Sequence, residues 1–258
     1  MTHEDSGVRV TVDGAVATLT LDRPEIRNAQ DPVLWAAMAE AIRSFGDDVR
    51  VVVVRGAGGT FSAGLNLRLL DPARTGEPGN LVDVVALSDE GARHAIGVFQ
   101  EPFALLADGP FLTIAVVEGH AIGAGFQLAL ACDLRLAADT ARFCMKEPAL
   151  GLVPDLAGTK PLVEAVGYAR ALEICATART VEADEALALG LVQQCVPAAE
   201  VDDALAALVG ALTAHDAVAV RETRELLRAA PGRNAREQRL AERTAQVPLL
   251  RRAVQRLG

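Results

Sequence analysis

Residues 111–167 decide the fold, and they read FLTIAVVEGHAIGAGFQLALACDLRLAADTARFCMKEPALGLVPDLAGTKPLVEAVG. The stretch opens with an apolar run at 111–117, which is short enough for a buried strand. Three glycines follow, at Gly119, Gly123 and Gly125, before an apolar segment at 126–131 and a second strand-like run at 134–138. Where a strand breaks at glycines and restarts as a helix, free backbone N–H groups can hold an anion or a developing negative charge.

Two acids, Glu147 and Asp155, stand in the second half of this stretch, within an apolar segment that Pro and Gly interrupt. A carboxyl in an apolar wall has its pKa raised by desolvation, which makes it a better base near neutral pH. If both acids face one cavity, each raises the other's tendency to hold a proton. Two alternatives stay open: Glu147 pairs with Lys146 or a nearby Arg, and Asp155 is the N-cap of a helix at 161–166.

The rest of the chain is typical of alternating strands and helices. Apolar alternation on both sides of Asp13-Gly14 predicts a hairpin of two strands, at 8–12 and 15–21. Asp31-Pro32 predicts the start of a helix that ends near Gly46. The further elements expected are a strand at 51–54, a glycine-rich loop at 56–65, a helix at 88–107, short helices at 161–167 and 169–176, a short strand at 181, a helix ending at Gly190, a strand at 191–196, and helices from 198 to the end with one interruption at Pro231-Gly232.

This order of elements predicts an α/β core at 1–197 and a C-terminal helical segment at 198–258. No GxGxxG directly follows the first strand, and no GxxxxGK[ST] occurs in the chain. The sequence therefore argues against a nucleotide-binding Rossmann or P-loop protein.

Composition excludes several classes of function. The 258 residues are 51% hydrophobic and carry a net charge of −9, which supports a large core and disfavours binding to nucleic acid or an anionic membrane. We expect a cytoplasmic chain with no membrane span and no signal peptide, because no apolar run approaches about 18 residues. Four cysteines without a CxxC pair predict buried free thiols, and four scattered histidines show no metal-ligand spacing.

Four motifs, in order along the chain, resemble the enoyl-CoA hydratase/isomerase family, also called the crotonase superfamily. They are RPEIRNA at 23–29, FSAGLNL at 61–67, VVEGHAIGAGFQLALACD at 116–133 and FCMKEPALGLVPDLAGT at 143–159. The resemblance covers about residues 8–197. It implies a crotonase-like spiral of ββα repeats followed by helices, and assembly as a homotrimer or a dimer of trimers. An apolar stripe near the C-terminus suits packing against a neighbouring subunit: Val247, Leu249, Leu250, Val254 and Leu257.

The resemblance also implies a shared chemical device, in which two backbone N–H groups polarise the carbonyl of an acyl-CoA thioester. By position, these donors are Leu65 and Ala124; the alternative is that the surrounding glycines only form tight turns. The resemblance further places substrate contacts at Ala63, Asn66, Gly123 and Gln127, although Asn66 departs from the family's usual Asp. Cations near the CoA phosphates would be Arg23, Arg27 and Arg68, and residues 69–87 would border the acyl pocket. The CoA thioester is expected to be the substrate, and no permanently bound cofactor or metal is expected.

The acids decide which reaction this resemblance implies. Family hydratases use two glutamates around a water, and the first of these aligns with Gln127, whose neutral amide cannot take a proton from water. Glu147 matches the second glutamate, and Asp155 follows it at the spacing of eight that dienoyl-CoA isomerases carry, although those enzymes have Asp where this chain has Gln127. We therefore expect an acyl-CoA isomerase that uses Glu147 and Asp155. The alternatives are a hydratase or a related lyase or hydrolase that uses Glu147 alone, and a non-catalytic acyl-CoA binder.

Overall fold

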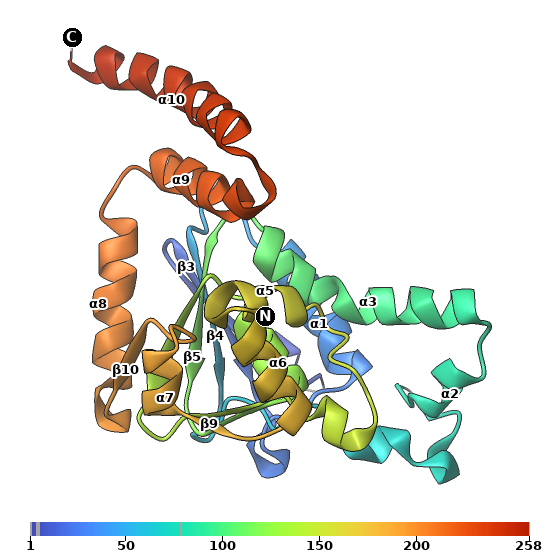
Figure 1. The fold of residues 1–258 in the computed structure, drawn as a ribbon. Coiled ribbons are helices and arrows are strands. Elements are labelled where there is room, and N and C mark those ends of the chain that lie inside the picture. Colours follow the sequence, from blue (N-terminus) through green and yellow to red (C-terminus); the bar gives the residue numbers. More distant parts are fainter. Residues whose placement is uncertain (1, 4–5, 78, 258) are drawn as a thin grey trace.

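A seven-stranded sheet forms the centre of the computed structural model, which describes residues 2–3, 6–77 and 79–257 (Figure 1). The strand order is β1-β2-β3-β4-β5-β7-β10. The strands are β1 (Thr2–His3), β2 (Val8–Asp13), β3 (Val16–Leu21), β4 (Val51–Gly56), β5 (Leu112–Val117), β7 (Leu134–Ala138) and β10 (Gln194–Val196). The strands from β3 to β10 run parallel, whereas β1, β2 and β3 pair antiparallel. The hairpin predicted around Asp13-Gly14 is confirmed, with Gly14 at φ +54° in the turn.

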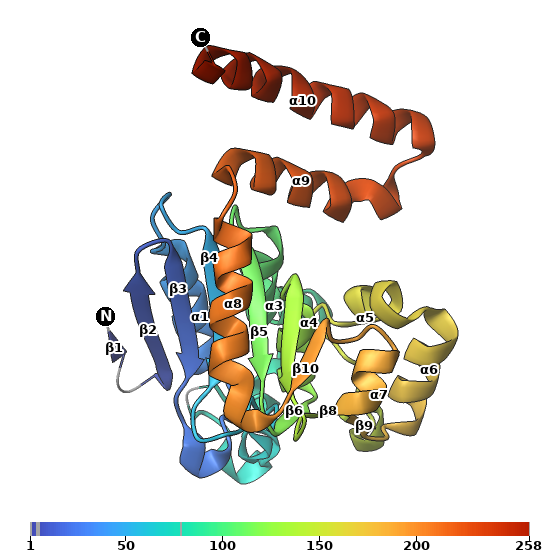
Figure 2. The same cartoon turned by 90° about the vertical axis from the view of Figure 1, so that its left-hand side faces the viewer.

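The parallel strands are apolar on both faces because helices cover both faces (Figure 2). In β4, Val51 and Val53 pack in a cluster with the helix α8 (Val201–Thr213). The alternate residues Val52 and Val54 pack in the main core with α1 (Pro32–Arg43) and α3 (Asp89–Asp108). The period of two along a strand therefore explains why every residue of 51–54 is apolar.

The helix starts follow from their capping residues. The Asp31 side chain accepts a hydrogen bond from the Leu34 N–H, and the Ser88 hydroxyl accepts one from the Gly91 N–H. The first helix ends at Arg43, three residues before the predicted stop at Gly46. The two helices pack through aromatic contacts, with the ring centroids of Trp35 and Phe99 5.3 Å apart.

A second sheet has three short strands in the order β6-β8-β9. Its strands are β6 (His120–Ile122), β8 (Arg142–Cys144) and β9 (Val181–Glu182). The remaining core helices are α2 (Val82–Val85), α4 (Ala124–Leu130), α5 (Thr159–Val166), α6 (Tyr168–Thr177) and α7 (Ala183–Ala188), with short 3-10 helices at Pro24–Ile26, Leu67–Leu70, Pro72–Arg74, Glu147–Leu150, Ala198–Glu200 and Ala230–Gly232. Every residue of α4 is buried, so the segment after the glycines is a core helix. The predicted mixed α/β architecture is confirmed.

The C-terminal segment contains one more break than the sequence predicted. The chain is interrupted at Pro231-Gly232 as expected, but α8 and α9 (Ala217–Ala229) are also separate and bent by 100°. The expectation of a single interruption was wrong because Asp216 starts a new helix, accepting hydrogen bonds from the N–H groups of Val218 and Ala219. Among the described residues, no single helix is long and apolar enough to cross a membrane, and only the bent α8–α9 pair reaches the required length and composition.

The last helix, α10 (Ala235–Leu257), runs antiparallel to α9 and extends away from the sheet (Figures 1 and 2). The predicted apolar stripe is divided on this helix. Leu249 lines a groove against α9, whereas Val247, Leu250 and Val254 are exposed. The side chain of Leu257 lies outside the described residues.

Candidate active site

The two glycine loops of the sequence meet in the structure. The Ser62 N–H donates to the His120 carbonyl at 2.7 Å, and the Ile122 N–H donates to the Ser62 carbonyl at 3.0 Å. Gly64 sits at φ +84°, and a Cβ atom added there would lie 2.3 Å from the Ile122 oxygen and 3.4 Å from the Ala124 nitrogen. Only glycine allows this approach, which brings the residue after it, Leu65, beside the start of α4.

The N–H groups of Leu65 and Ala124 donate no hydrogen bond to any residue that the structure describes. The backbone groups around them are occupied. Gln30 binds the Gly64 carbonyl and the Asn66 N–H, at 2.7 and 2.8 Å, and the Gly123 N–H donates to Cys144 at 2.8 Å. Ala124 is the first residue of α4, where the helix leaves N–H groups unpaired. Two free donors on adjoining loops are the arrangement that an oxyanion requires, and their binding to a substrate oxygen stays a prediction.

A buried polar network holds the first loop in place. The Asn28 amide donates to the carbonyls of Ala57 and Thr60, at 2.9 and 2.7 Å. The Trp35 indole donates to Gln30 at 2.8 Å, and Gln30 donates in turn to the Ser62 hydroxyl at 3.0 Å. Asn28, Gln30 and Ser62 are all 0% exposed. Sequence reasoning gave none of these side chains a supporting role, although polar residues in two adjoining motifs were a signal.

Glu147 lies next to the second loop. A Cβ atom added to Gly123 would come within 3.1 Å of its Oε1 atom. Oε1 accepts a hydrogen bond from Gln127 Nε2 at 2.7 Å, while Oε2 is buried and has no hydrogen-bond partner in the described part of the chain. Burial raises the pKa of Glu147, and the charge of Asp155 raises it further. The Glu147 carboxyl thus has a raised pKa and lies next to Gly123, the residue before Ala124.

Both open alternatives for the two acids are wrong. Across residues 2–3, 6–77 and 79–257, no basic side chain forms an ion pair with Glu147. The N-cap of α5 is Gly158, so Asp155 does not cap that helix. Asp155 is exposed, yet partial burial of its carboxyl still raises its pKa. The charge of Asp155 contributes to the raised pKa of Glu147, and whether the two carboxyls face one cavity stays a prediction.

The other predicted substrate contacts lie around the loops. Gln127 is 1% exposed, and its amide bonds Glu147, Leu156 and Gly158; a direct contact with substrate or water stays a prediction. The Ala63 N–H donates to the Arg27 carbonyl at 2.8 Å, and the Asn66 side chain accepts from the Arg68 N–H at 3.3 Å.

The three arginines predicted to contact the CoA phosphates differ in whether their guanidinium groups already bind other residues. The Arg23 guanidinium pairs with Asp31 and donates to the Ser6 carbonyl at 2.8 Å, and it lies over Gly7. Arg27 and Arg68 are exposed, and neither pairs with an acid in the part of the chain that the structure describes. Arg23 therefore has a structural task, while Arg27 and Arg68 remain available to an anion.

The cysteines of this chain are free thiols, and the residues that the structure describes show no metal site. All four cysteines are free, with Cys132 and Cys144 buried; the prediction of buried thiols was wrong for Cys175 and Cys195, which are partly exposed. The described residues contain no group of three or more His, Cys, Asp or Glu side chains that could hold a metal ion.

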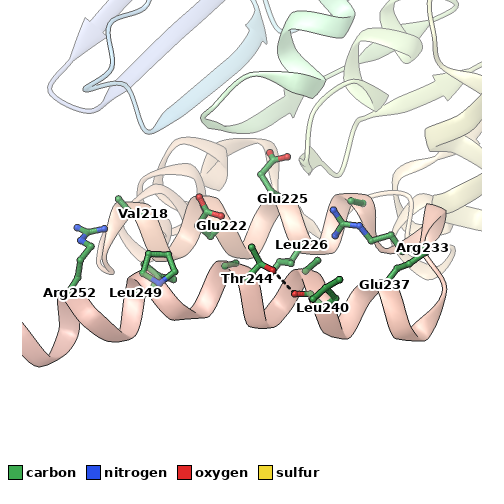
Figure 3. A pocket seen from close by; sticks show the side chains of 14 residues that line it. Val218, Glu222, Glu225, Leu226, Arg233, Glu237, Leu240, Thr244, Leu249 and Arg252 are labelled. Carbon is green, nitrogen blue, oxygen red and sulfur yellow. Dashed lines mark hydrogen bonds between the residues drawn. The ribbon is translucent and has the colours of Figure 1, made fainter.

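A groove with a distinct lining lies elsewhere, between the last two helices. It occupies about 570 Å³ between α9 and α10 and is lined by side chains such as Glu222, Leu226, Leu240 and Leu249 (Figure 3). None of its lining residues belongs to the two glycine loops, and neither Glu147 nor Asp155 lines it. We place the candidate site on the loops because the free N–H donors and the raised carboxyl pKa values occur there.

The fold and these loops define an α/β class of protein in which two free backbone N–H groups adjoin a partly buried carboxyl. The chain belongs to the enoyl-CoA hydratase/isomerase family, whose sequence model matches residues 11–255. This membership confirms the expected crotonase-like fold and an enzyme of this family.

Several known proteins are similar to this chain. Human mitochondrial Delta(3,5)-Delta(2,4)-dienoyl-CoA isomerase is 36% identical over 227 residues, covering 86% of this chain and 68% of the isomerase. Carnitinyl-CoA dehydratase of Salmonella enteritidis is 36% identical over 225 residues, covering 86% and 80%. A Thermobifida fusca protein solved in complex with acetoacetyl-CoA is 45% identical, with a TM-score of 0.92 and 96% of each chain covered. These relatives include both an isomerase and a dehydratase, so similarity alone does not separate the two reactions.

Proposed function

We propose that this chain is an acyl-CoA isomerase that shifts a carbon–carbon double bond of an unsaturated acyl-CoA through a thioester enolate. One observation carries the proposal: the Glu147 carboxyl has a raised pKa, and its Oε2 atom has no hydrogen-bond partner among the described residues. This carboxyl adjoins the loop that presents the free Ala124 N–H. An isomerisation needs a proton removed at one carbon and delivered at another. It needs no activated water.

The proposed steps conserve the proton and the electron pairs. A carboxylate removes a proton from the carbon next to the thioester carbonyl, and the released electron pair moves onto the carbonyl oxygen. The Leu65 and Ala124 N–H groups hold the resulting enolate oxygen, and one such donor is worth about 3 kcal/mol. As the enolate collapses, the double bond shifts and a carboxylic acid delivers a proton at the far end of the shifted bond. Glu147 and Asp155 fill these two roles.

Gln127 favours isomerisation over hydration. Its amide cannot accept a proton from water at a useful rate, so this chain has only one of the two acids that activate a water in the hydratases it resembles. The second candidate is hydration by Glu147 alone, and the dehydratase relative at 36% identity is the observation that favours it.

The substrate proposal rests on the relative solved with acetoacetyl-CoA and on two free cations, Arg27 and Arg68. Arg68 follows the loop that carries Leu65, and the Arg27 carbonyl accepts from the Ala63 N–H of that loop, which supports a contact of both with the CoA phosphates. Replacing both Arg27 and Arg68 by Ala should weaken CoA binding. The difference in affinity from the wild type should shrink as the salt concentration rises. Isothermal titration with CoA at two ionic strengths measures both effects. Equal affinity in the wild type and the double variant would remove these residues from the site.

We also propose a homotrimer or a dimer of trimers. The exposed apolar side chains Val247, Leu250 and Val254 on α10, with Leu227 on α9, support it, because such surfaces favour association. Light scattering tests this, and a monomer at micromolar concentration would contradict it.

The reaction itself is tested with 3-enoyl-, 2-enoyl- and dienoyl-CoA substrates in deuterated water. An isomerase moves the double bond and incorporates deuterium at the carbons that exchange protons. Production of a 3-hydroxyacyl-CoA would instead support the hydratase. Tight binding without exchange would show a non-catalytic binder.

A further inference from the structure

Both the oxygen and the nitrogen of the Gln127 side-chain amide form hydrogen bonds within the chain. Its Oε1 atom accepts from the Leu156 N–H at 2.8 Å and from the Gly158 N–H at 3.3 Å. Its Nε2 atom donates to Glu147 Oε1 at 2.7 Å. The loop at 156–158 also packs on the side chain, since a Cβ atom added to Gly158 would lie 2.6 Å from Gln127 Cγ.

These contacts leave the amide only one orientation. Backbone N–H groups can only donate, so the atom that faces Leu156 and Gly158 must be the amide oxygen. The amide nitrogen must then face Glu147, and a nitrogen of this kind can only donate. Glu147 Oε1 is therefore the acceptor of this bond, and because a carbonyl oxygen accepts better than a hydroxyl oxygen, the amide favours a proton on Oε2.

The same side chain connects the two acids. Leu156 directly follows Asp155, and the Asp155 carbonyl is held from the other side by Gln100 Nε2 of α3 at 2.6 Å. Gln127 thus joins the carboxylate of Glu147 to the loop that carries Asp155.

We propose that Gln127 is a positioning residue that confines the transferable proton of Glu147 to Oε2 and fixes the Asp155 loop relative to it. The catalytic meaning of this role rests on the proposed isomerase function. Gln127 is then more than the replacement of a hydratase glutamate by a neutral residue. Its amide determines which oxygen of Glu147 carries the transferred proton.

A glutamate at this place would act differently. Its carboxylate could still accept from the Leu156 and Gly158 N–H groups, but its second oxygen would face Glu147 Oε1 across 2.7 Å. Two carboxylate oxygens this close must share a proton, so the pair would titrate in two steps. With Gln127, Glu147 titrates without such a partner.

The groups around Glu147 are Asp155, the neighbouring Lys146, Cys144 of β8 and Cys175 of α6. Burial raises the pKa of both thiols, and the charge of Glu147 raises them further, so the thiols stay neutral near pH 7. A change in the titration of Glu147 on replacing Gln127 therefore reports the lost amide.

The test uses the ligand-free full chain and the variants Gln127→Met and Gln127→Glu. The matched control is Gln193→Met, because Gln193 also accepts from a backbone N–H, that of Arg135 at 2.8 Å, on another part of the fold. Hydrogen exchange of the Leu156 amide should be about tenfold faster in Gln127→Met, and unchanged in Gln127→Glu and Gln193→Met. Carbon-13 NMR of Glu147, assigned with Glu147→Gln, should show a higher pKa in Gln127→Met and two steps in Gln127→Glu.

Kinetics supply the catalytic readout. Gln127→Met should lower kcat for isomerisation at least tenfold with little change in KM, and its pH profile should move with the NMR titration of Glu147. Unchanged Leu156 exchange in Gln127→Met, or an unchanged Glu147 titration in both Gln127 variants, would overturn the positioning role. If the NMR results hold but the wild type moves no double bond, the isomerase proposal fails and the positioning of Glu147 stands. Gln127→Glu keeps the loop contacts, so the test remains decisive if Gln127→Met does not fold.

Discussion

Arg224 in α9 binds Asp133, which lies 91 residues earlier and directly before β7. The Arg224 Nε atom lies 2.9 and 2.8 Å from the two carboxylate oxygens of Asp133. Asp133 also accepts from the backbone N–H of Thr113 at 2.8 Å, and Arg224 donates to the Gly109 carbonyl at 2.9 Å. The Arg224 side chain is only 5% exposed. One buried guanidinium therefore ties the C-terminal helices to the turn before β5.

Arg224→Met should destabilise the protein strongly, because it leaves the Asp133 carboxylate without its cation. Breaking a buried pair in this way costs about 3–5 kcal/mol. The control Arg228→Met removes an Arg on the same helix that is 40% exposed and pairs with Asp108, and it should cost at most about 1 kcal/mol. Urea denaturation measures both free energies of unfolding. Equal losses in the two variants would show that Arg224 is no anchor.

Glu147→Gln should abolish most of the isomerase activity, because an amide can neither take nor deliver the proton. General acid–base groups contribute about 10²–10⁴-fold to the rate, so kcat should fall by about that factor with little change in KM. Glu164→Gln is the control, since Glu164 is exposed and pairs with Lys160 on α5. Asp155→Asn should also lower kcat. The isomerase mechanism fails if Glu147→Gln and Asp155→Asn both leave turnover unchanged.

Local sequence signals predicted the fold well. Asp13-Gly14 specified the hairpin, and Asp31 and Ser88 specified two helix starts, because each of these signals acts through its own neighbours in the chain. The Leu65 and Ala124 segments were predicted to act together only through resemblance. The structure supplies the physical reason, which is the close approach of Gly64 to Ile122.

Long-range contacts were not predictable in the same way. Arg224 looks like any charged residue of a helix until the fold brings it to Asp133. The role of Gln127 depends on two N–H groups of a loop about 30 residues later, which no spacing in the sequence reveals. Asp216 was a missed local signal, since Asp before an apolar run is a common N-cap.

The pH dependence of both activity and stability should report Glu147. Burial raises its pKa in the folded protein, so kcat/KM should rise with pH through a value above the ordinary range of a glutamate. Between the unfolded and folded pKa values the folded state holds more protons, so stability falls as pH rises through this window. Glu147→Gln should therefore raise Tm relative to the wild type more at pH 8 than at pH 5. The opposite order would mean that Glu147 is stabilised in its charged form.

Gly64→Ala should damage the candidate site beyond the ordinary cost of its backbone conformation. The added Cβ would meet the Ile122 oxygen at 2.3 Å, which forces apart the loops that bring Leu65 beside Ala124. The matched control is Gly190→Ala, because Gly190 has a similar φ of +76° but its nearest atom would lie 3.8 Å away. Both variants should lose about 1 kcal/mol or more from the left-handed backbone, and only Gly64→Ala should also lose turnover and deuterium exchange into the thioester. If the two variants retain equal turnover at equal stability, the close approach of the loops does not build the oxyanion site.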